Sequence, residues 1–269
     1  MEETINHLEF IISHTGKTSK HLDNSELTST QLFCFGLLER LQNASLALKI
    51  LLQTISCNPS LEFSCGIILR SCLLDSLIAL NLYKILLDNE KGSKSEEEKE
   101  NNVKEFCEEN LSDGLSATIK YISAAKDANI ITQSQLKETF KNMANNYSTF
   151  FKPYPDDGSI PLLKYSKYYA PAELFKNLAN SQELKELTKI YDEYLFFSKY
   201  DHFGILYYEV ARQNFSEQME RIKKGIELFI GTQSILHFTL LKYSRDDTFL
   251  SNQSNIATEY LHTKIFSQP

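Results

Sequence analysis

The chain lacks tryptophan altogether and contains few residues that break helices. Only 9 glycines and 6 prolines occur among its 269 residues, so few positions favour turns. The remaining composition, 42% hydrophobic and 23% charged, is ordinary for a globular protein. A chain of this length can bury a large core in one domain or in two.

Signature loops for nucleotide binding are absent as well. Neither GxxxxGK[ST] nor GxGxxG occurs, which excludes the standard phosphate-binding loops. The net charge of -7 and the pI near 5.5 disfavour general binding to nucleic-acid backbones, which relies on clustered lysine and arginine. A local basic group at Arg221, Lys223 and Lys224 is interpreted as a solvated helix face.

Targeting segments are not evident either. The first ten residues, MEETINHLEF, are acidic and lack the basic and apolar regions of a secretory signal. The longest apolar region, residues 61–88, is interrupted by Arg70, Asp75 and Lys84, which excludes an ordinary membrane span. We therefore expect a cytoplasmic protein without a membrane partner.

Cysteine and histidine spacings do not indicate a metal site. The five cysteines form no CxxC pair, and we expect free thiols that are mostly buried. His7, His14 and His21 repeat every seven residues, which places neighbours about 10 Å apart on a helix. That separation is too large for one shared ion. We expect neither a metal nor a cofactor.

Hydrophobic periodicity predicts helices almost throughout, and therefore an all-α, multi-helix bundle. The second predicted helix is apolar nearly all round, which is typical of a central helix surrounded by others. With the first, it should form an antiparallel hairpin at the centre of the bundle. The predicted ranges are 26–56, 60–87, 103–129, 133–147, 172–178, 182–201, 215–243 and 255–266.

One long segment is predicted to be irregular. Four of the six prolines lie between Pro153 and Pro171, and proline at this density interrupts a helix. A loop of this length is either a divider or a functional lid. We expect a single domain over residues 1–269, with a subdivision into 1–150, a Pro- and Tyr-rich loop at 151–171, and 172–269 as the alternative. The charged segment 91–102 is a linker or a solvated helix start.

The stretch YDEYLFFSKYDHFG supplies the first candidate site. On a helix, Tyr191, Tyr194, Ser198 and His202 share one face, because their spacings are three and four residues. A polar face among phenylalanines must meet polar partners. Ten of the fourteen tyrosines lie between residues 147 and 208, which suits a half-wet pocket and equally an aromatic core.

The second candidate feature is a pair of charges on the central helix. Arg70 and Asp75 occur within GIILRSCLLDSLIAL, where an unpaired charge is costly. They point about 140° apart on a helix, so each needs a partner from another helix. Glu39 is a candidate partner for Arg70, and His202 or a tyrosine hydroxyl is a candidate for Asp75. Such a network is either structural or part of a ligand site.

The segments RSCLLDSLIALNLY and YDEYLFFSKYDHFG together resemble a group of bacterial all-helical proteins distantly related to the HEPN superfamily. The resemblance implies a helical bundle, tied in some members to RNA cleavage or nucleotide binding in toxin and phage-defence systems. The residues that match by motif position are Arg70, Asp75, Tyr194, Ser198, Tyr200 and His202.

The chain also departs from that superfamily. HEPN ribonucleases place a histidine a few residues after an arginine on one helix, and no arginine of this chain has one. A ribonuclease activity would therefore need Arg70 and His202 to converge from separate helices.

Two functional hypotheses follow. In the first, a polar pocket binds a nucleotide, a small anion or an RNA end, with Arg70 and His202 as catalytic candidates. Its ligand-binding candidates are Asp75, Tyr194, Ser198 and Tyr200. In the second, the same residues form a structural network, and the protein is a non-enzymatic helical interaction module or homodimer. Solvent access of His202 discriminates between them.

Overall fold

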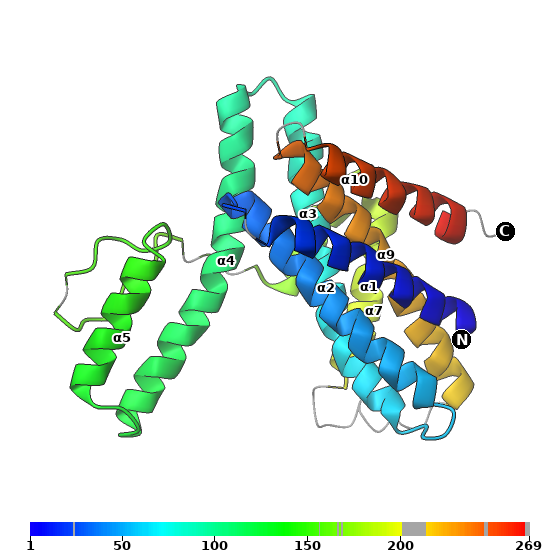
Figure 1. Cartoon of the computed structure of the whole chain (residues 1–269), viewed down its shortest axis with the longest axis horizontal. Helices are drawn as coiled ribbons and strands as arrows, with labels where there is room; N and C mark the ends of the chain where they lie inside the picture. The colour runs from blue at the N-terminus through cyan, green and yellow to red at the C-terminus, as the bar shows by residue number, and fades with distance from the viewer. Residues whose placement is uncertain are drawn as a thin grey trace. The chain divides into compact units, whose positions relative to one another are not determined.

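A computed structural model of the chain describes residues 1–23, 25–155, 157–165, 167, 169–200, 214–244 and 247–266. These residues form helices joined by loops (Figure 1). Strand pairing within these ranges is limited to an isolated antiparallel bridge between Phe151 and Leu163. The predicted all-α fold is confirmed. The helices are α1 (Glu2–Leu22), α2 (Ser29–Thr54), α3 (Leu61–Lys91), α4 (Glu96–Asp127), α5 (Gln133–Asn146), α6 (Pro171–Ala179), η1 (Lys185–Thr188), α7 (Lys189–Ser198), α9 (Phe215–Lys242), α10 (Thr248–Leu261) and η2 (His262–Phe266).

The helices group into two compact units. The main unit comprises residues 1–94 and 170–269, and the α4–α5 unit comprises residues 95–169. The main unit thus combines N-terminal and C-terminal helices, a grouping that differs from the sequence-based subdivision at 150 and 171. Grouping of contacts does not test whether the units fold independently, so the expectation of a single domain stays a prediction.

Helix α3 lies at the centre of the main unit, as its apolar sequence predicts. It packs against α2, α6, α7 and α9, and Leu69, Leu73 and Leu77 are completely buried. Asn81 ties it to α6, because its side-chain amide donates to the Leu174 carbonyl at 3.1 Å. The short connection of residues 55–60 joins α2 to α3 as the predicted helix pair. The central apolar helix is therefore confirmed.

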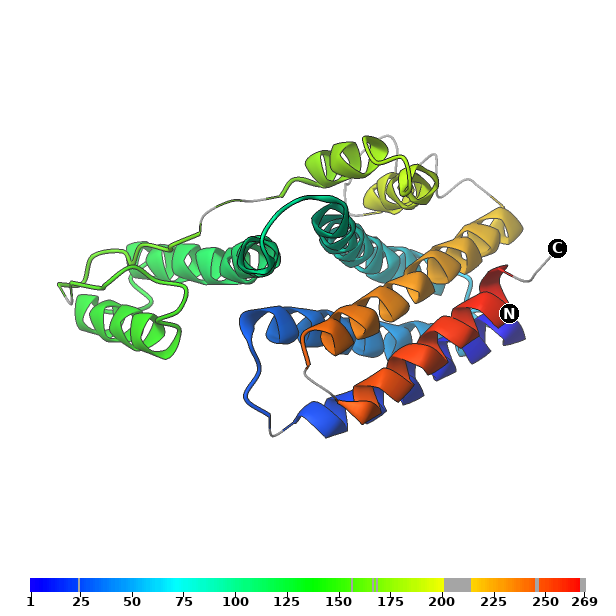
Figure 2. The same cartoon turned by 90° about the horizontal axis from the view of Figure 1, so that it is seen from above.

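Helix α1 was not among the predicted helices. It packs against α2, α9 and α10, and Figure 2 shows it (blue) alongside α10 (red). Its buried face combines Leu8 and Ile11 with His14, Thr15 and Thr18. Because more than half of this face is polar, apolar periodicity does not reveal the helix. The opposite helix, α10, begins seven residues before its predicted start.

The α4–α5 unit contains two capped helices. Ser95 and Glu98 form a capping box at the start of α4, and Thr132 and Gln135 form one at the start of α5. Each cap satisfies backbone amides that a helix leaves free. The charged segment 91–102 is accordingly a helix start over most of its length. Residues from both helices and the following loop form the core of the α4–α5 unit: Ile119, Ile122, Leu136, Phe140, Met143, Ala144 and Phe151.

The Pro-rich segment is irregular, as predicted. It returns on itself through two backbone hydrogen bonds of 2.8 Å, from the Lys152 amide to the Leu162 carbonyl and from the Lys164 amide to the Phe150 carbonyl. Gly158 lies in the segment with φ of 85°, a left-handed conformation that glycine adopts without steric cost.

Candidate functional site

The predicted polar face of residues 191–202 begins on α7. Tyr194 and Tyr200 are buried, and Ser198 is half-buried. The Ser198 hydroxyl donates to the Tyr194 carbonyl at 2.7 Å, so it bonds to its own helix. His202 lies outside the described residues, and its place on this face stays a prediction.

Arg70 and Tyr194 meet between α3 and α7. The Arg70 guanidinium lies over the Tyr194 ring, with 5.8 Å between its Cζ atom and the ring centroid. A guanidinium over an aromatic face is attracted by the ring quadrupole. Tyr191 continues the aromatic row, because its ring stacks on Tyr194 at 6.0 Å and on Phe175 at 4.4 Å. The two motif segments from which the resemblance was drawn therefore lie in contact.

Tyr200 forms a hydrogen bond to a buried acid. The hydroxyl donates to the carboxylate of Glu62 on α3, and both residues are buried. Burial raises the pKa of Glu62, and the hydrogen bond from Tyr200 opposes that shift. The Tyr200 ring covers Gly66, where a Cβ atom would lie 2.9 Å from it. Gly66 therefore allows this ring to approach α3 closely.

Asp75 pairs with Arg40 of α2. The Arg40 Nε atom lies 3.0 Å from Asp75 Oδ2, and its Nη2 donates to the Ser71 hydroxyl at 3.3 Å. Burial raises the pKa of Asp75 to about 6, and Arg40 opposes the rise. The sequence predicts His202 or a tyrosine hydroxyl as the partner of this acid, whereas the structure pairs it with Arg40. Arg40 reaches Asp75 because it lies next to the face of α2 that packs on α3.

Glu193 is a buried acid that the sequence analysis missed. Its side chain is 2% exposed and pairs with Lys224 at 2.6 Å and Arg221 at 3.3 Å, both from α9. Arg221 also lies over the Phe196 ring at 4.1 Å. Sequence spacing indicates its burial, because Glu193 shares a helix face with the apolar residues Ile190 and Phe197.

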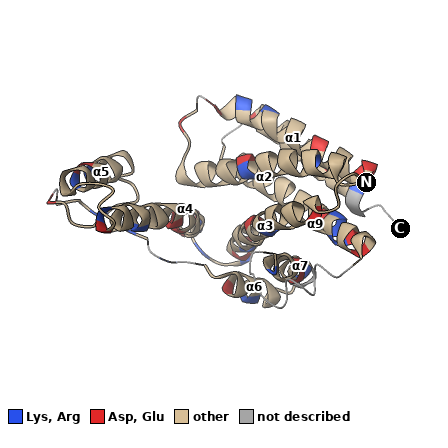
Figure 3. Cartoon of the chain, turned by 90° about the horizontal axis from the view of Figure 1, so that it is seen from below, with Lys and Arg blue, Asp and Glu red and all other residues tan. Residues whose placement is uncertain are grey.

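The basic group on α9 is therefore charge-compensated. Its third member, Lys223, lies 3.7 Å from both Glu3 and Glu227. Figure 3 shows acidic and basic residues interspersed along α9. The interpretation as a helix face without a phosphate-binding role agrees with these ion pairs.

A second polar cluster connects α1, α9 and α10. His14 Nε2 donates to the Gln253 carbonyl at 3.0 Å, and Gln233 donates its amide to His14 Nδ1 at 3.1 Å. His237 Nδ1 donates to the Gln233 carbonyl at 2.8 Å, and the Thr18 hydroxyl donates to its Nε2 at 2.9 Å. Each histidine thus accepts one hydrogen bond, which requires its neutral form.

Burial makes these two histidines weak bases. It lowers the pKa of His14 to about 4 and that of His237 to about 3, and the proximity of His14 adds to the second shift. Their ring centroids are 4.5 Å apart. The seven-residue spacing places His14 on one face of a helix with His7 and His21. It does not indicate the hydrogen-bond partners of this cluster, because those lie on α9 and α10, far away in the sequence.

The described residues offer little for metal chemistry. No group of three or more histidine, cysteine, aspartate or glutamate side chains among them is placed to hold an ion. The five cysteines are free thiols, and all except Cys57 are buried, which confirms their prediction.

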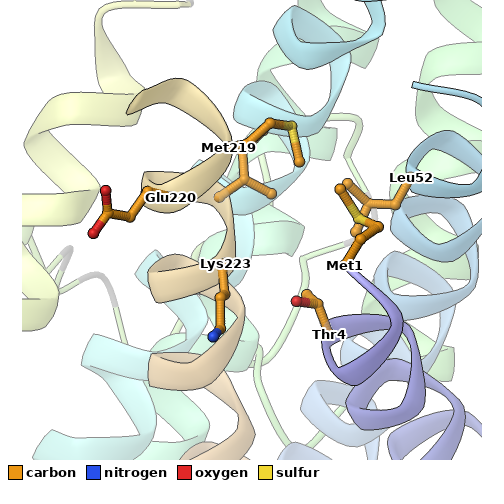
Figure 4. A pocket seen from close by; sticks show the side chains of 7 residues that line it. Met1, Thr4, Leu52, Met219, Glu220 and Lys223 are labelled. Carbon is orange, nitrogen blue, oxygen red and sulfur yellow. The ribbon is translucent and has the colours of Figure 1, made fainter. Parts of the chain in front are cut away.

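One cavity of about 220 Å³ opens at the N-terminal end of α1. Figure 4 shows it between α1, α2 and α9. Its wall is mainly apolar, formed by Met1, Leu52, Met219 and Ile222. It brings together none of the predicted site residues.

Helix α3 passes a test of length and hydropathy for a membrane span, the one described helix to do so. More than half of its most apolar window, 56%, is buried inside the fold. A core helix of a soluble protein has the same properties, and the fold is compatible with a soluble protein.

No family model, no curated protein and no solved structure matches the chain. The site must therefore be interpreted from its own contacts. The contact of Arg70 with Tyr194 holds α7 on α3, the bond of Tyr200 to Glu62 holds the residues after α7 on α3, and the pair of Asp75 with Arg40 holds α2 on α3. Ser198 bonds within its own helix.

Proposed function

We propose that the chain is a helical interaction module that forms a homodimer through the outward face of α2 and α3. The observation that carries the proposal is an exposed stripe along α2. Leu32, Leu46 and Ile50 are 43%, 47% and 56% exposed, although they lie in a helix of a chain with a large apolar core. Leu46 and Ile50 lie one turn apart, and Leu32 lies on the same side near the other end of the helix. Exposed apolar side chains that share one side of a helix are typical of protein interfaces.

The stripe has the spacing of a helix–helix seam. Residues 32, 36, 39, 43, 46 and 50 alternate steps of four and three, which keeps them on one side of the helix. Its ends are leucine and isoleucine, and its centre is polar, at Glu39 and Asn43. A seam with apolar ends and a polar centre can fix the register of a partner.

The neighbouring face of α3 extends this surface. Ile67 is 38% exposed, and Leu74 and Ile78 are half-buried. The partial burial of the apolar α3 window fits a helix that the main unit covers incompletely. Arg40 connects the two helices on this side through Ser71 and Asp75.

A second copy of the chain is the partner that this stripe fits. In an antiparallel pair of α2 helices related by a two-fold axis at residue 41, residue numbers of opposing positions add up to 82. Leu32 then meets Ile50, and Glu39 meets Asn43, whose amide can donate to the carboxylate. Gly36 meets Leu46, and a side chain at Gly36 would find no atom within 4 Å in the monomer. Self-complementary contacts of this kind are those of a two-fold dimer.

The contacts around Arg70 and Asp75 support a structural role for those residues. Ser198, Tyr200, Asp75 and Glu193 each bond within the main unit. The hypothesis of a pocket for a nucleotide, small anion or RNA end depends on His202 and stays a prediction, as do the HEPN relationship and the cytoplasmic location. Its test is His202→Ala, which should remove ligand binding while the fold persists.

The homodimer is tested by the mass of the full chain in solution, measured by light scattering over a range of concentrations. We expect a dimer, and Leu46→Glu should raise its dissociation constant at least tenfold, because a charge replaces an apolar seam contact. Leu195→Glu is the matched control. Leu195 is 46% exposed on α7, away from the stripe, and its variant should dimerise like the wild type.

Two outcomes contradict the proposal. One is a wild type that stays monomeric at every concentration. The other is an equal change in dissociation constant for Leu46→Glu and Leu195→Glu. The circular dichroism of both variants should match the wild type, since both positions face solvent in the monomer.

A further inference from the structure

The Pro-rich segment after α5 presents exposed apolar and basic side chains on one side. Phe151 and Leu163 oppose each other in the antiparallel bridge, and both pack into the core of the α4–α5 unit. Successive side chains of extended segments point to opposite sides. Lys152, Leu162 and Lys164, adjacent to the bridge, therefore point away from the core, and all three are exposed. The Lys152 amide donates to the Leu162 carbonyl, so these two residues are cross-strand neighbours.

Exposure alternates along the second arm of this segment in the same way. Pro161 is buried, whereas Ile160 and Leu162, on either side of it, are 57% and 64% exposed. Among the large apolar side chains of the described residues, only those of Tyr121 and Ile130 are more exposed than this pair, and both belong to the same unit. We call the four exposed side chains of the segment the outer face: Lys152, Ile160, Leu162 and Lys164.

The two lysines of the outer face carry uncompensated charge. Neither Lys152 nor Lys164 forms an ion pair with a carboxylate of the described residues. The Lys164 ammonium donates to the carbonyls of Ser148 and Thr149 at 3.3 and 2.8 Å, and these groups have no net charge. Residues 115–169 contain seven lysines and four acids, although the whole chain has a net charge of -7. The outer face therefore belongs to a basic part of an acidic chain.

One acid lies in the turn that joins the two arms. The Asp157 carboxylate accepts a hydrogen bond from the Ser159 amide at 2.8 Å. This bond holds the pKa of Asp157 below its ordinary value, and Lys137 of α5 contributes to the shift. The acid is thus partly compensated by a lysine outside the outer face. Its charge weakens the attraction of the segment for anions without cancelling that of two lysines.

The composition of the outer face favours a lipid surface over a protein partner. Lysine is depleted in protein–protein interfaces, whereas arginine and aromatic residues are enriched there, and the outer face contains neither of the enriched kinds. An anionic bilayer attracts lysine electrostatically and accepts neighbouring apolar side chains below its headgroups. Nucleic acid offers the negative charge of its phosphates but no apolar layer for isoleucine and leucine.

We propose that the outer face docks the chain on the surface of an anionic lipid bilayer. Ile160 and Leu162 enter the boundary between headgroups and acyl chains, and Lys152 and Lys164 contact the anionic headgroups. Peripheral binding of this kind needs no helix that spans the membrane. The negative charge of the rest of the chain is repelled by the same surface, which confines binding to this basic part.

Vesicle flotation with the full chain tests the proposal. The probes are vesicles of equal parts phosphatidylserine and phosphatidylcholine, and vesicles of phosphatidylcholine alone. We expect the chain to bind the first kind, more weakly as salt is added, and to bind the second kind far less. Lys152→Gln and Leu162→Ser should each weaken binding about fivefold, through lost charge attraction and lost apolar contact respectively.

Matched controls come from the main unit. Lys176→Gln removes the same charge from an exposed position on α6, and Leu195→Ser removes an exposed leucine from α7. Both variants should bind vesicles like the wild type. Asp157→Asn should strengthen binding, because it removes a repelled charge and keeps an acceptor for the Ser159 amide.

The absence of tryptophan from the chain allows insertion to be measured directly. In Leu162→Trp the introduced indole is the one tryptophan signal. Its emission should shift to shorter wavelength on the anionic vesicles, and brominated acyl chains should quench it. Leu195→Trp places the indole on α7 and should show neither effect.

Four results overturn the proposal. The first is equal binding to both kinds of vesicle, or binding to neither. The second is equal weakening by Lys152→Gln and Lys176→Gln. The third is unchanged emission of Leu162→Trp on vesicles that bind the chain, which shows adsorption without insertion. The fourth is RNA that displaces the chain from vesicles and whose own binding is weakened by Lys152→Gln but not by Leu162→Ser, which identifies a nucleic-acid surface. None of the substituted residues belongs to α2 or α3, so the mass in solution should be the same for all variants, and failure here is distinguishable from failure of the dimer.

Discussion

Arg40 of α2 neutralises the buried carboxylate of Asp75 on α3, with Nε and Oδ2 3.0 Å apart. The pair is asymmetric, because the Arg40 side chain is 61% exposed and that of Asp75 is 10% exposed. Desolvation therefore falls mainly on the acid, which explains why its pKa rises to about 6 despite the adjacent guanidinium. The contact lies at the edge of the proposed dimer surface and ties its two helices together.

Loss of Arg40 should destabilise the fold in a pH-dependent way. The folded pKa of Asp75 is above its unfolded value of 3.8, so its contribution to stability is fully present below about pH 3.8. That contribution is lost as the pH rises through 6. Arg40→Met should therefore cost about 1 kcal/mol at pH 7.5, a small value because the arginine is exposed, and clearly less at pH 5. Urea unfolding at the two pH values measures both.

The control is a double-mutant cycle with Asp75→Asn. Without the ionisable group, Arg40→Met should lose most of its effect and its pH dependence. An equal cost of Arg40→Met at pH 5 and pH 7.5 would show that packing of the arginine, not its charge, stabilises the hairpin.

Gly66 should not tolerate a methyl group. Its Cβ would lie 2.9 Å from the Tyr200 ring, and overpacking of this kind costs about 1–3 kcal/mol. We therefore expect Gly66→Ala to lower the free energy of unfolding, although alanine favours helices. The control is Gly114→Ala on α4, where no atom lies within 4 Å, and it should stabilise by about 0.5–1 kcal/mol.

The Tyr200 ring can be tested as the cause. In a Tyr200→Ala background, Gly66→Ala should become neutral or stabilising, because the space above the glycine is open. If Gly66→Ala remains equally harmful there, the close approach of Tyr200 is not what the glycine permits.

The helices that the sequence predicted are those with regular apolar faces. Helix α3 is the clearest case, since its all-round apolar sequence has one physical solution, a position between other helices. The prediction for α9 also holds, with Ile226 and Phe229 fully buried. The apolar pattern does not predict helix α1, because His14 and Thr18 occupy positions that apolar residues usually fill.

The candidate site was only partly predictable, for a different reason. Periodicity showed that Asp75 must have a partner and that Tyr194 shares a face with other polar groups. It could not choose the partner, because Arg40 and Asp75 are separated by a helix–helix connection whose geometry fixes their contact. The ion pairs of Glu193 with α9 likewise depend on tertiary packing. The place of His202 on the same face as Tyr194 is a prediction from helical spacing alone.

The His14 and His237 pair should make the fold sensitive to mild acid. Both folded pKa values, about 4 and about 3, are below the unfolded value of 6.5. The unfolded chain therefore binds protons first as the pH falls from 6.5 towards 4, and stability falls by up to about 1.4 kcal/mol per pH unit for each histidine. Asp75 has the opposite effect, because the folded chain takes up one proton at this residue between pH 6 and 4, which stabilises the fold.

A His14→Gln, His237→Gln variant should show a flatter pH profile in this range, even if it is less stable at pH 7. Urea unfolding between pH 4 and 7 measures the slope. Asp75→Asn should have the opposite effect and steepen it. An identical slope in the wild type and the double variant would contradict the assignment of acid sensitivity to these two residues.

The proposed dimer register makes a specific cross-linking prediction. Opposing positions add up to 82, so position 36 of one copy lies beside position 46 of the other. In a Cys57→Ser background, the double variant Gly36→Cys, Leu46→Cys should form an intermolecular disulfide under mild oxidation, while either single variant should not, because neither position faces itself. The other native thiols should not interfere, since they are buried, and burial raises the pKa of Cys65 to about 12. Leu32→Cys, Leu46→Cys is the control for register, because these numbers add up to 78. Cross-linking of that pair as efficient as that of 36 with 46 would refute the proposed register, even if the chain is an antiparallel dimer.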